Sequence, residues 1–230
     1  MIESLQSPHV GRVKALLSSK KSRYDEGLFI VEGLQGVREA LQDGIETLYL
    51  TESGKSRLDK HQLDVSAVNV VPISDKVASA MSDAISPQGI IAICKIRENE
   101  LSSASGSVIY LNEIQDPGNA GTILRTADAM GISAVITSPG SVDFYSPKVV
   151  RSTAGSLWHL PLCQGMDLMK VREILPNHAL YILDSSATKT MSDIDFTNPA
   201  IWIFGNEARG LKTEIADAEK IAISMPGRAE

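Results

Sequence analysis

Residues 116–127 read Asp-Pro-Gly-Asn-Ala-Gly-Thr-Ile-Leu-Arg-Thr-Ala and follow the short apolar stretch 108–112. The apolar stretch predicts a buried strand, and the residues after it predict a turn that leads into a helix. Two glycines in the turn allow another group to approach the backbone closely. The stretch therefore predicts a strand, turn and helix with polar side chains at the strand's end.

Two later stretches repeat this arrangement. The apolar residues 201–204 run into 205–211, which read Gly-Asn-Glu-Ala-Arg-Gly-Leu, and residues 221–225 run into Pro226 and Gly227. Open α/β sheets bind ligands outside the carboxyl ends of their strands. We therefore expect the three glycine-containing turns to meet at one ligand site.

Composition permits a folded protein of one large or two small domains, because 43% of the 230 residues are hydrophobic. The formal net charge of −6 argues mildly against a nucleic-acid partner when charge is averaged over the chain. One stretch departs from that average, because no acidic residue interrupts its five basic ones. These are Arg12, Lys14, Lys20, Lys21 and Arg23. The stretch is either a contact for RNA phosphates or a solvated basic face.

Several classes of protein are disfavoured by what the sequence lacks. Cys94 and Cys163 lie far apart without a histidine at metal-ligand spacing, which argues against a disulfide framework and a metal site. The first ten residues lack the apolar core of a signal peptide, and no stretch is long enough to span a membrane. P-loop and hydrolase-triad patterns are also missing. We expect a cytoplasmic protein.

The first part of the chain predicts a compact α/β domain over residues 1–98. Its expected strands and helices alternate up to a small, polar segment at 99–107, which is typical of a flexible linker. Strands are expected at 28–31, 47–51, 68–72 and 90–94, and helices within 4–23, at 34–42 and from about 75.

Residues 108–230 alternate strands and helices throughout, which predicts a second α/β domain. Strands are expected at 108–112, 134–137, 179–183, 201–204 and 221–224, and helices at about 120–130, 147–154, 167–174 and 210–216.

The segments 119–127, 205–211 and 223–227 resemble the three motifs of the SpoU (TrmH-type) branch of the SPOUT RNA methyltransferases, in the family's order and at its usual separations. The resemblance implies a parallel sheet with a C-terminal trefoil knot. The family's third motif normally continues with Ser-Leu-Asn and a final helix, so a chain that stops at Glu230 is expected to be C-terminally incomplete. Residues 29–33, Phe-Ile-Val-Glu-Gly, resemble part of the L30e-like substrate-binding domain of ribosomal-RNA members.

The same resemblance implies S-adenosylmethionine-dependent methylation of a ribose 2′-hydroxyl in RNA. Ribosomal (23S-type) RNA is favoured by the L30e-like domain, and a homodimer through the catalytic domain is implied. Two alternatives stay open, namely a transfer-RNA ribose methyltransferase and a non-catalytic RNA-binding protein on the same scaffold.

Three polar residues are candidates for catalysis. Asn119 is either a helix N-cap or an amide that positions the ribose or the catalytic arginine. Arg125 lies off the expected buried stripe of Ile123, Ala127 and Met130. It either pairs with Asp128 or, as the resemblance implies, activates the 2′-hydroxyl. Because arginine is a poor base, we expect it to do so by fixing a phosphate or stabilising the alkoxide.

Glu207 is the third candidate for catalysis. It is either an acid in the first turn of a helix or a carboxylate that orients Asn119 or Arg125. Gly205, Ile223 and Met225 match family positions whose backbone cradles the cofactor, and the two apolar side chains also suit a strand core. Lys148 and Arg151 lie in a segment that resembles one near the family's site, and are candidate RNA contacts.

Overall fold

The computed structural model describes residues 1–211 and 215–223. Its chain forms two compact units. The first unit comprises Met1–Arg97 and Asp143–His159, and the second comprises Glu98–Val142 and Leu160–Glu230. The expected boundary near residue 98 thus lies close to the boundary between units, but residues 143–159 join the first unit rather than the second.

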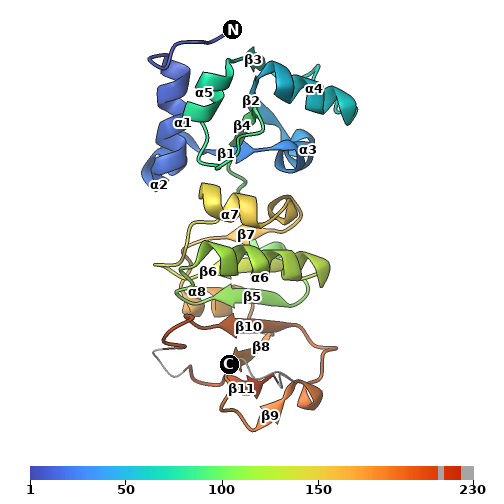
Figure 1. The fold of residues 1–230 in the computed structure, drawn as a ribbon. Coiled ribbons are helices and arrows are strands. Elements are labelled where there is room, and N and C mark those ends of the chain that lie inside the picture. Colours follow the sequence, from blue (N-terminus) through green and yellow to red (C-terminus); the bar gives the residue numbers. More distant parts are fainter. Residues whose placement is uncertain (212–214, 224–230) are drawn as a thin grey trace. The chain divides into compact units, whose positions relative to one another are not determined.

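A four-stranded sheet forms the centre of the first unit (Figure 1). The strands β1 and β2 both pair antiparallel with β4, and β2 pairs parallel with β3. Apolar residues occupy both faces of β1 and β4, so the sheet is covered on each side. The strands are β1 (Leu28–Glu32), β2 (Ile45–Leu50), β3 (Val70–Pro72) and β4 (Ile90–Lys95).

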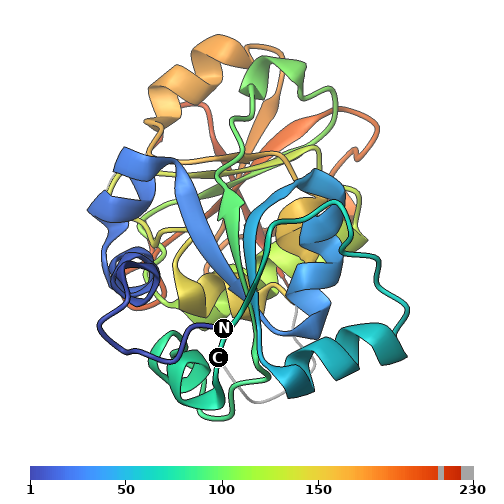
Figure 2. The same ribbon diagram turned by 90° about the horizontal axis from the view of Figure 1, so that it is seen from above.

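Helices cover the two faces of this sheet. The helices α1 and α5 lie on one face, where Val10, Val13 and Leu16 pack against a core that includes Ile30 and Ile91, and α3 and α4 lie on the other (Figure 2). The helices are α1 (Pro8–Ser18), α2 (Lys20–Glu26), α3 (Leu34–Asp43), α4 (Glu52–Lys60) and α5 (Asp75–Ala80).

Two features of these helices differ from the expected ones. The helical pattern at 4–23 is interrupted at Ser19, whose backbone is extended and whose side chain accepts a hydrogen bond from the backbone N–H of Ser22. Ser19 therefore starts a new helix as an N-cap. The unexpected helix α4 buries only Gly54 and Leu58, so its sequence carries too narrow an apolar stripe to indicate a helix.

The segment 143–159 covers the open edge of the sheet in the first unit. Strand β1 pairs only with β4, so its other edge needs protection. The rings of Tyr145 and Trp158 lie 4.8 and 5.6 Å from the ring of Phe29. Helix α7 (Pro147–Ser152) contacts β1 as well. These contacts explain why residues 143–159 join the first unit.

A seven-stranded sheet forms the second unit, and all its strand pairs are parallel. The strand order is β7-β6-β5-β10-β8-β11-β9, and the expected parallel sheet is therefore confirmed. The strands are β5 (Val108–Leu111), β6 (Ala134–Thr137), β7 (Leu162–Cys163), β8 (Ala179–Leu183), β9 (Lys189–Thr190), β10 (Ala200–Phe204) and β11 (Glu219–Ala222).

Helices α6 (Pro117–Ala129) and α8 (Leu168–Ile174) lie on opposite faces of this sheet (Figure 1). Val171 of α8 belongs to the same buried apolar core as Tyr110, Ile182 and Ile203. Leu101, within the expected linker, is 4% exposed and belongs to the same core. The segment 99–107 is therefore partly packed, and its role as a linker between a recognition and a catalytic domain stays a prediction.

Helix α6 buries a different stripe from the expected one. It begins at Pro117 with Asp116 as N-cap, and Ala120, Leu124 and Ala127 are buried on one side. Met130, expected in the stripe, is 74% exposed. Residues 212–214 and 224–230 lie outside those described. The expected helix at 210–216 is not found at its described ends, because Gly210 pairs with Asn206 and residues 211, 215 and 216 are not helical. The knot, which the resemblance places after β11, stays a prediction.

Candidate active site

The loops that follow β5 and β10 form the candidate site. These strands are parallel neighbours, with Phe204 opposite Leu111, so their carboxyl ends lie side by side. The backbone N–H of Asn112 extends the pairing by donating to the carbonyl of Phe204 at 2.8 Å. The turn before α6 and the loop 205–211 therefore meet at one edge of the sheet, as the sequence predicts for two of its three turns.

Asn119 and Glu207 are brought together at this edge. The amide Nδ2 of Asn119 donates to Glu207 Oε1 at 3.2 Å, and the backbone N–H of Asp116 donates to the same oxygen at 3.3 Å. Asn119 is not the helix N-cap, because Asp116 Oδ1 accepts a hydrogen bond from the Asn119 backbone N–H at 2.8 Å. The Asn119 side chain is therefore available to Glu207, and both residues stay exposed.

Hydrogen bonds keep Glu207 ionised. Burial raises the pKa of Glu207, but hydrogen bonds from its own backbone N–H, from the Asn119 amide and from the backbones of Asp116 and Gln115 outweigh burial and lower that pKa below 4.5. The group is consequently a carboxylate at neutral pH and a hydrogen-bond acceptor for its neighbours.

Asn206 and Glu113 were not singled out from the sequence, yet they connect the two loops. The buried Asn206 donates through Nδ2 to the carbonyl of Glu113 at 2.8 Å. Glu113 also accepts, through Oε2, a hydrogen bond from Arg209 at 3.4 Å. The asparagine before Glu207 was the only sequence indication of this link, and an asparagine in a turn is too common to carry that meaning.

Arg125 does not join this network. It is exposed on α6, as its position off the buried stripe predicts, and makes no ion pair, with Asp128 or otherwise, among the residues that the structure describes. It lies six residues after Asn119, which is about 240° around the helix. The structure therefore unites Asn119 and Glu207 but leaves Arg125 on another side of α6.

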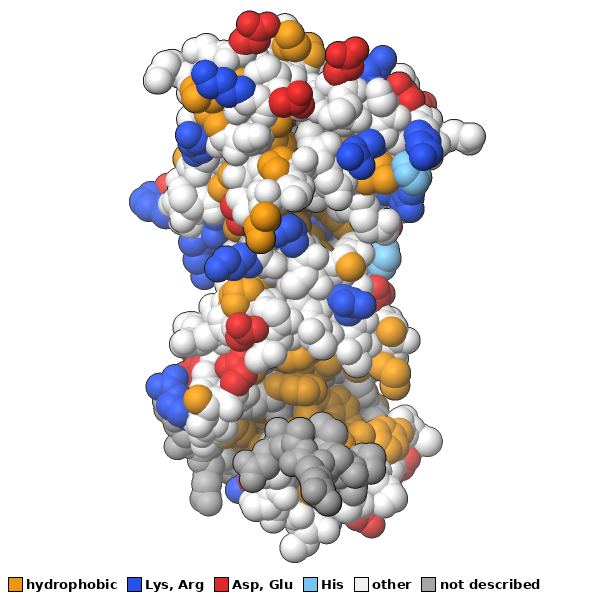
Figure 3. Space-filling model, in the orientation of Figure 1, with side chains coloured by type: hydrophobic (Ala, Val, Ile, Leu, Met, Phe, Trp, Pro, Cys, Tyr) orange, Lys and Arg blue, Asp and Glu red, His pale blue; other side chains and the backbone are white. Residues whose placement is uncertain are grey.

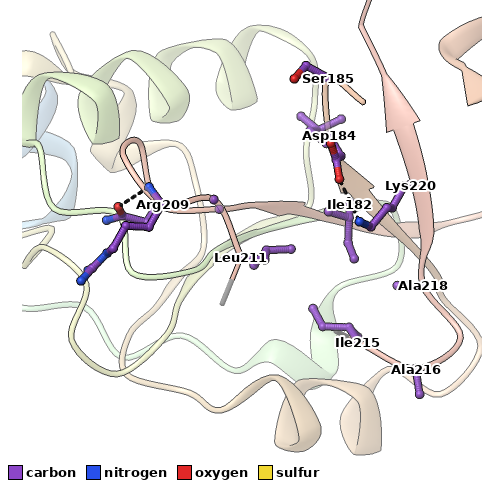
Figure 4. A pocket seen from close by; sticks show the side chains of 13 residues that line it. Ile182, Asp184, Ser185, Arg209, Leu211, Ile215, Ala216, Ala218 and Lys220 are labelled. Atoms are coloured by element: carbon purple, nitrogen blue, oxygen red, sulfur yellow. Dashed lines mark hydrogen bonds and ion pairs between the residues drawn. The ribbon is translucent and has the colours of Figure 1, made fainter. Parts of the chain in front are cut away.

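A cleft of about 840 Å³ lies beside the loop 205–211. Gly205 lines it, and a side chain at Gly205 would meet the backbone of Gly210 at 2.7 Å. The apolar part of the wall includes Leu211, Ile215 and Ala218, and the backbone after β8 contributes Asp184 (Figure 4). Polar and charged side chains, among them Asp184 and Lys220, share the wall with these apolar residues. A concave site that combines apolar contacts with placed polar groups suits a small molecule.

A charged pair also belongs to this cleft and was missed from the sequence. Asp184 Oδ2 lies 3.0 Å from Lys220 Nζ, and Figure 4 shows the pair apart from Arg209, whose side chain extends away from Leu211. Hydrogen bonds from the side chain and backbone of Ser186, with Lys220, lower the pKa of Asp184 to about 2. Asp184 thus presents a permanent negative charge at the carboxyl end of β8.

Of the other two expected cofactor residues, Ile223 and Met225, the structure describes only Ile223. Ile223 follows β11 and is 47% exposed, so it is not a core residue of the strand. Met225 lies outside the described residues. Among the described residues, Gly205 is the one of the three predicted positions that lines the cleft.

Several basic residues of the stretch 12–23 form ion pairs within the first unit. Arg23, expected to contact RNA, is instead 4% exposed, and its guanidinium donates to Asp143 Oδ2 at 2.7 and 3.0 Å and to the carbonyl of Leu16. These partners occupy the group that would meet a phosphate, so the structure does not support Arg23 as an RNA contact, and that role stays a prediction.

Lys14, Lys20 and Lys21 are exposed, although Lys21 pairs with Asp25 and Lys20 lies over the ring of Tyr24. Arg12 instead bridges Glu26 and Glu46. Basic and acidic side chains both lie on the face drawn in Figure 3, which therefore carries no uniform charge.

Two further expectations concern the first unit and metal binding. Arg151 forms a two-pronged ion pair with Asp83, with one contact at 3.1 Å, while Lys148 is exposed. Among residues 1–211 and 215–223, no group of three or more His, Cys, Asp or Glu side chains could hold a metal ion. No helix in the described part of the chain is long and apolar enough to cross a membrane.

Two family descriptions match the chain. Residues 106–230 match the SpoU rRNA methylase family, and residues 8–92 match the MRM3-like substrate binding domain. The first match covers more than half of the chain. The second falls within the first compact unit.

Individual proteins agree with these matches. An uncharacterized tRNA/rRNA methyltransferase of Synechocystis is 31% identical across 98% of this chain and 85% of the relative. The 23S rRNA (guanosine(2553)-2′-O)-methyltransferase RlmP of Bacillus subtilis is 29% identical across 100% of this chain and 92% of the relative. An AdoMet-bound rRNA methyltransferase of Sinorhizobium meliloti has a TM-score of 0.84 and 28% identity, covering 100% of this chain and 90% of that one. The chain belongs to the SpoU rRNA methylase family.

Proposed function

We propose that this protein transfers the methyl group of S-adenosylmethionine to a ribose 2′-hydroxyl of RNA, with ribosomal RNA as the substrate. The observation that carries the proposal is the hydrogen-bonded pair Asn119–Glu207, which lies at the carboxyl ends of two parallel strands. The cleft lined by Gly205 lies beside the same loop. Family membership and the 2′-O-methyltransferase relative support the same reaction.

The reaction is a displacement in which a ribose oxygen gains a methyl group. When bound, S-adenosylmethionine would supply the methyl group from its sulfonium sulfur, and the demethylated cofactor would be a thioether. The O–CH₃ bond forms as the S–CH₃ bond breaks, and the hydroxyl proton is lost to a base. The protein must therefore hold the hydroxyl close to the donor and stabilise developing negative charge on its oxygen.

The described residues suit positioning better than proton removal. Because hydrogen bonds lower the pKa of Glu207, its carboxylate is a weak base, and its role is to orient the Asn119 amide. The planar guanidinium of Arg125 presents several hydrogen-bond donors, so it fixes a phosphate or stabilises the developing alkoxide. The hydroxyl proton then passes to a substrate phosphate or to water.

The cleft beside the loop 205–211 fits the cofactor. Backbone at Gly205 and Gly210 is exposed to it, and Leu211, Ile215 and Ala218 offer apolar contacts for an adenosyl group. A pocket of about 300–1,000 Å³ is typical for a ligand of this size. Ile223 and Met225 are proposed to complete the cofactor site from the end of β11.

A transfer-RNA substrate is the less favoured alternative, because two relatives that are named by a target nucleotide are 23S rRNA 2′-O-methyltransferases. A non-catalytic RNA-binding role is also less favoured, because Asn119 and Glu207 retain their mutual hydrogen bond. We further propose a homodimer through the second unit and a cytoplasmic location, both of which rest on the family resemblance.

The experiment is methyl transfer from isotope-labelled S-adenosylmethionine to RNA from cells that lack this gene. We expect label in ribosomal RNA and none in transfer RNA. Label in transfer RNA alone would reverse the preference between substrates. Binding of S-adenosylmethionine without transfer to either RNA, measured beside an active relative, would favour the non-catalytic role. Light scattering of the same preparation measures the oligomeric state.

A further inference from the structure

Asn206 is a buried polar residue whose hydrogen-bonding capacity is fully used. Its Oδ1 accepts from the backbone N–H groups of Ala208 at 3.1 Å and Arg209 at 3.2 Å. Its Nδ2 donates to the carbonyl of Glu113 at 2.8 Å and to Glu207 Oε2 at 3.4 Å. Two donors face the oxygen and two acceptors face the nitrogen, so the orientation of the amide is fixed by its surroundings.

These four bonds join the two sides of the candidate site. Ala208 and Arg209 belong to the loop after β10, whereas Glu113 belongs to the turn between β5 and α6. The backbone N–H and carbonyl of Asn206 also exchange hydrogen bonds with Gly210 at 3.0 and 2.8 Å, which closes the loop into a tight ring. The amide is therefore the shared link between the loop that carries Glu207 and the turn that leads to Asn119.

The partner of Asn206 in the β5 turn is itself held in an uncommon conformation. Glu113 has a φ of +56°, in the left-handed region that residues other than glycine rarely adopt. The Ser138 hydroxyl accepts a hydrogen bond from the Glu113 backbone N–H at 2.9 Å, and Glu113 Oε2 meets Arg209. Strained backbone of this kind persists where surrounding contacts hold it, and it gathers at functional sites.

We propose that Asn206 is a positioning residue that holds the Glu207 carboxylate against Asn119, in the reaction given under Proposed function, on which this inference rests. Asn206 is buried at the wall of the cleft, and both polar atoms of its amide already bond to protein groups, so it acts through Glu207 rather than on the substrate. The second oxygen of Glu207 meets Asn206 while the first meets Asn119. Removing the Asn206 donor frees the carboxylate to turn away.

The substitution Asn206→Asp separates this role from simple loop formation. Aspartate keeps the oxygen that accepts from Ala208 and Arg209, but it replaces the donor with a second acceptor that faces Glu207. Two carboxylates at this distance raise the pKa of one of them. Within residues 1–211 and 215–223, the other charged residues of this network are Asp116 at the start of α6, Glu113 after β5 and Arg209 in the loop of Glu207, and all three remain unchanged.

We expect two effects of Asn206→Asp. The pKa of Glu207, followed by carboxyl ¹³C NMR and assigned by its loss in Glu207→Gln, rises above the wild-type value. Turnover with RNA falls on the order of 10²-fold, because a small displacement of a positioned group has a cost of that size. The matched control is Asn198→Asp, which makes the same change at an exposed amide that donates to Asp195, and this variant keeps both wild-type values.

A double-mutant cycle distinguishes positioning from a purely structural role. If Asn206 acts through Glu207, Asn206→Asp causes no further loss of turnover in the Glu207→Gln background. Equal losses in both backgrounds, or an unchanged Glu207 pKa in Asn206→Asp, would overturn the inference. If Asn206→Asp does not fold, the same cycle is measured with Asn206→Ser, which keeps a hydroxyl that can accept a hydrogen bond. Wild-type turnover in Glu207→Gln alone would instead contradict the proposed role of Glu207 in the function.

Discussion

Arg23 in the first unit and Arg125 in the second show how differently two arginines singled out from sequence can be used. Arg23 is 4% exposed and its guanidinium is held by Asp143 and by the carbonyl of Leu16. Arg125 is exposed and makes no ion pair with any residue in the described ranges. A charge that is buried and fully partnered stabilises the fold, whereas one left exposed near a polar site is free for a ligand.

The two networks around these arginines differ in the same way. Asp143 accepts from Arg23, from the hydroxyl of Tyr24 and from the backbone N–H of Tyr145, so it ties the segment 143–159 to α2. Glu207 accepts from Asn119 and Asp116 at an exposed sheet edge. The first network should therefore affect unfolding, and the second should affect methyl transfer.

The largest expected effect is on stability. Asp143→Ala removes the partner of a buried guanidinium, so we expect the free energy of unfolding to fall by about 3–5 kcal/mol, as is typical for breaking a buried pair. Denaturant unfolding measures it. The control is Asp25→Ala, which breaks the exposed pair with Lys21 and should cost about 1 kcal/mol or less. Equal losses in the two variants would contradict the contrast between buried and exposed pairs.

Arg125→Ala should produce the opposite pattern. Because Arg125 is exposed, the free energy of unfolding should change by about 0.5 kcal/mol or less. Turnover should fall on the order of 10²-fold or more, as is typical when a group that assists the reacting hydroxyl is lost. Arg125→Lys should restore little, because a point charge cannot replace the planar guanidinium. A folded alanine variant with near-normal turnover would remove Arg125 from the proposed mechanism.

Two glutamates extend the comparison to pH. Burial, with the nearby charge of Asp83, raises the pKa of Glu32 above 4.5 despite hydrogen bonding from Ser82, whereas the pKa of Glu207 is lowered. Glu32 therefore contributes most stability below its unfolded pKa, and this contribution is lost as pH rises through its folded pKa. Glu207 contributes stability above its unfolded pKa, and loses it as pH falls through its folded pKa.

We expect Glu32→Gln, which stays neutral, to be more stable than the wild type at about pH 8 and to lose that advantage at about pH 4. Glu207→Gln should show no such gain at about pH 8. Thermal unfolding across this pH range measures both. A Glu32→Gln variant that is less stable than the wild type at the higher pH would indicate that the Glu32 charge is favourable in the fold.

The smallest expected effect concerns Lys14 and Lys20, the two exposed residues of the basic stretch that are not in an ion pair within the described residues. If Lys14 and Lys20 contact phosphates, the variant with alanine at both should bind RNA more weakly, and the log–log salt slope should fall by about 0.7–0.9 for each lost contact. Arg12→Ala is the control, because its guanidinium already bridges Glu26 and Glu46. A double variant with the wild-type salt slope would show that Lys14 and Lys20 form a solvated face.

Local pattern predicted most of the fold. Strands such as β6 and β8 were predictable because each is a short apolar run with clear ends, and the parallel sheet followed from the family resemblance. The position of the segment 143–159 was not predictable, because its packing against β1 depends on long-range contacts such as that of Phe29 with Tyr145. The stripe of α6 was assigned incorrectly because the helix begins earlier, at Pro117, with Asp116 as cap.

The site was predictable only in part, for a related reason. Asn119 and Glu207 belong to motifs, and their contact follows from the parallel pairing of β5 with β10. Motifs could not distinguish a buried basic residue from an exposed one. Arg23 and Arg12 are both basic residues of one stretch, but the structure gives them different partners and different burial. The role of Asn206 could not be predicted from the sequence, because it depends on a hydrogen bond to the backbone carbonyl of Glu113.

The most direct test of the central claim is the chemical identity of the methylated product. Ribosomal RNA from cells lacking the gene is incubated with the protein and S-adenosylmethionine, digested to nucleosides and analysed by mass spectrometry. The proposed site predicts a gain of one 2′-O-methyl nucleoside with wild-type protein and its near absence with Glu207→Gln. A methyl group on a base, or equal 2′-O-methylation by wild type and Glu207→Gln, would contradict it.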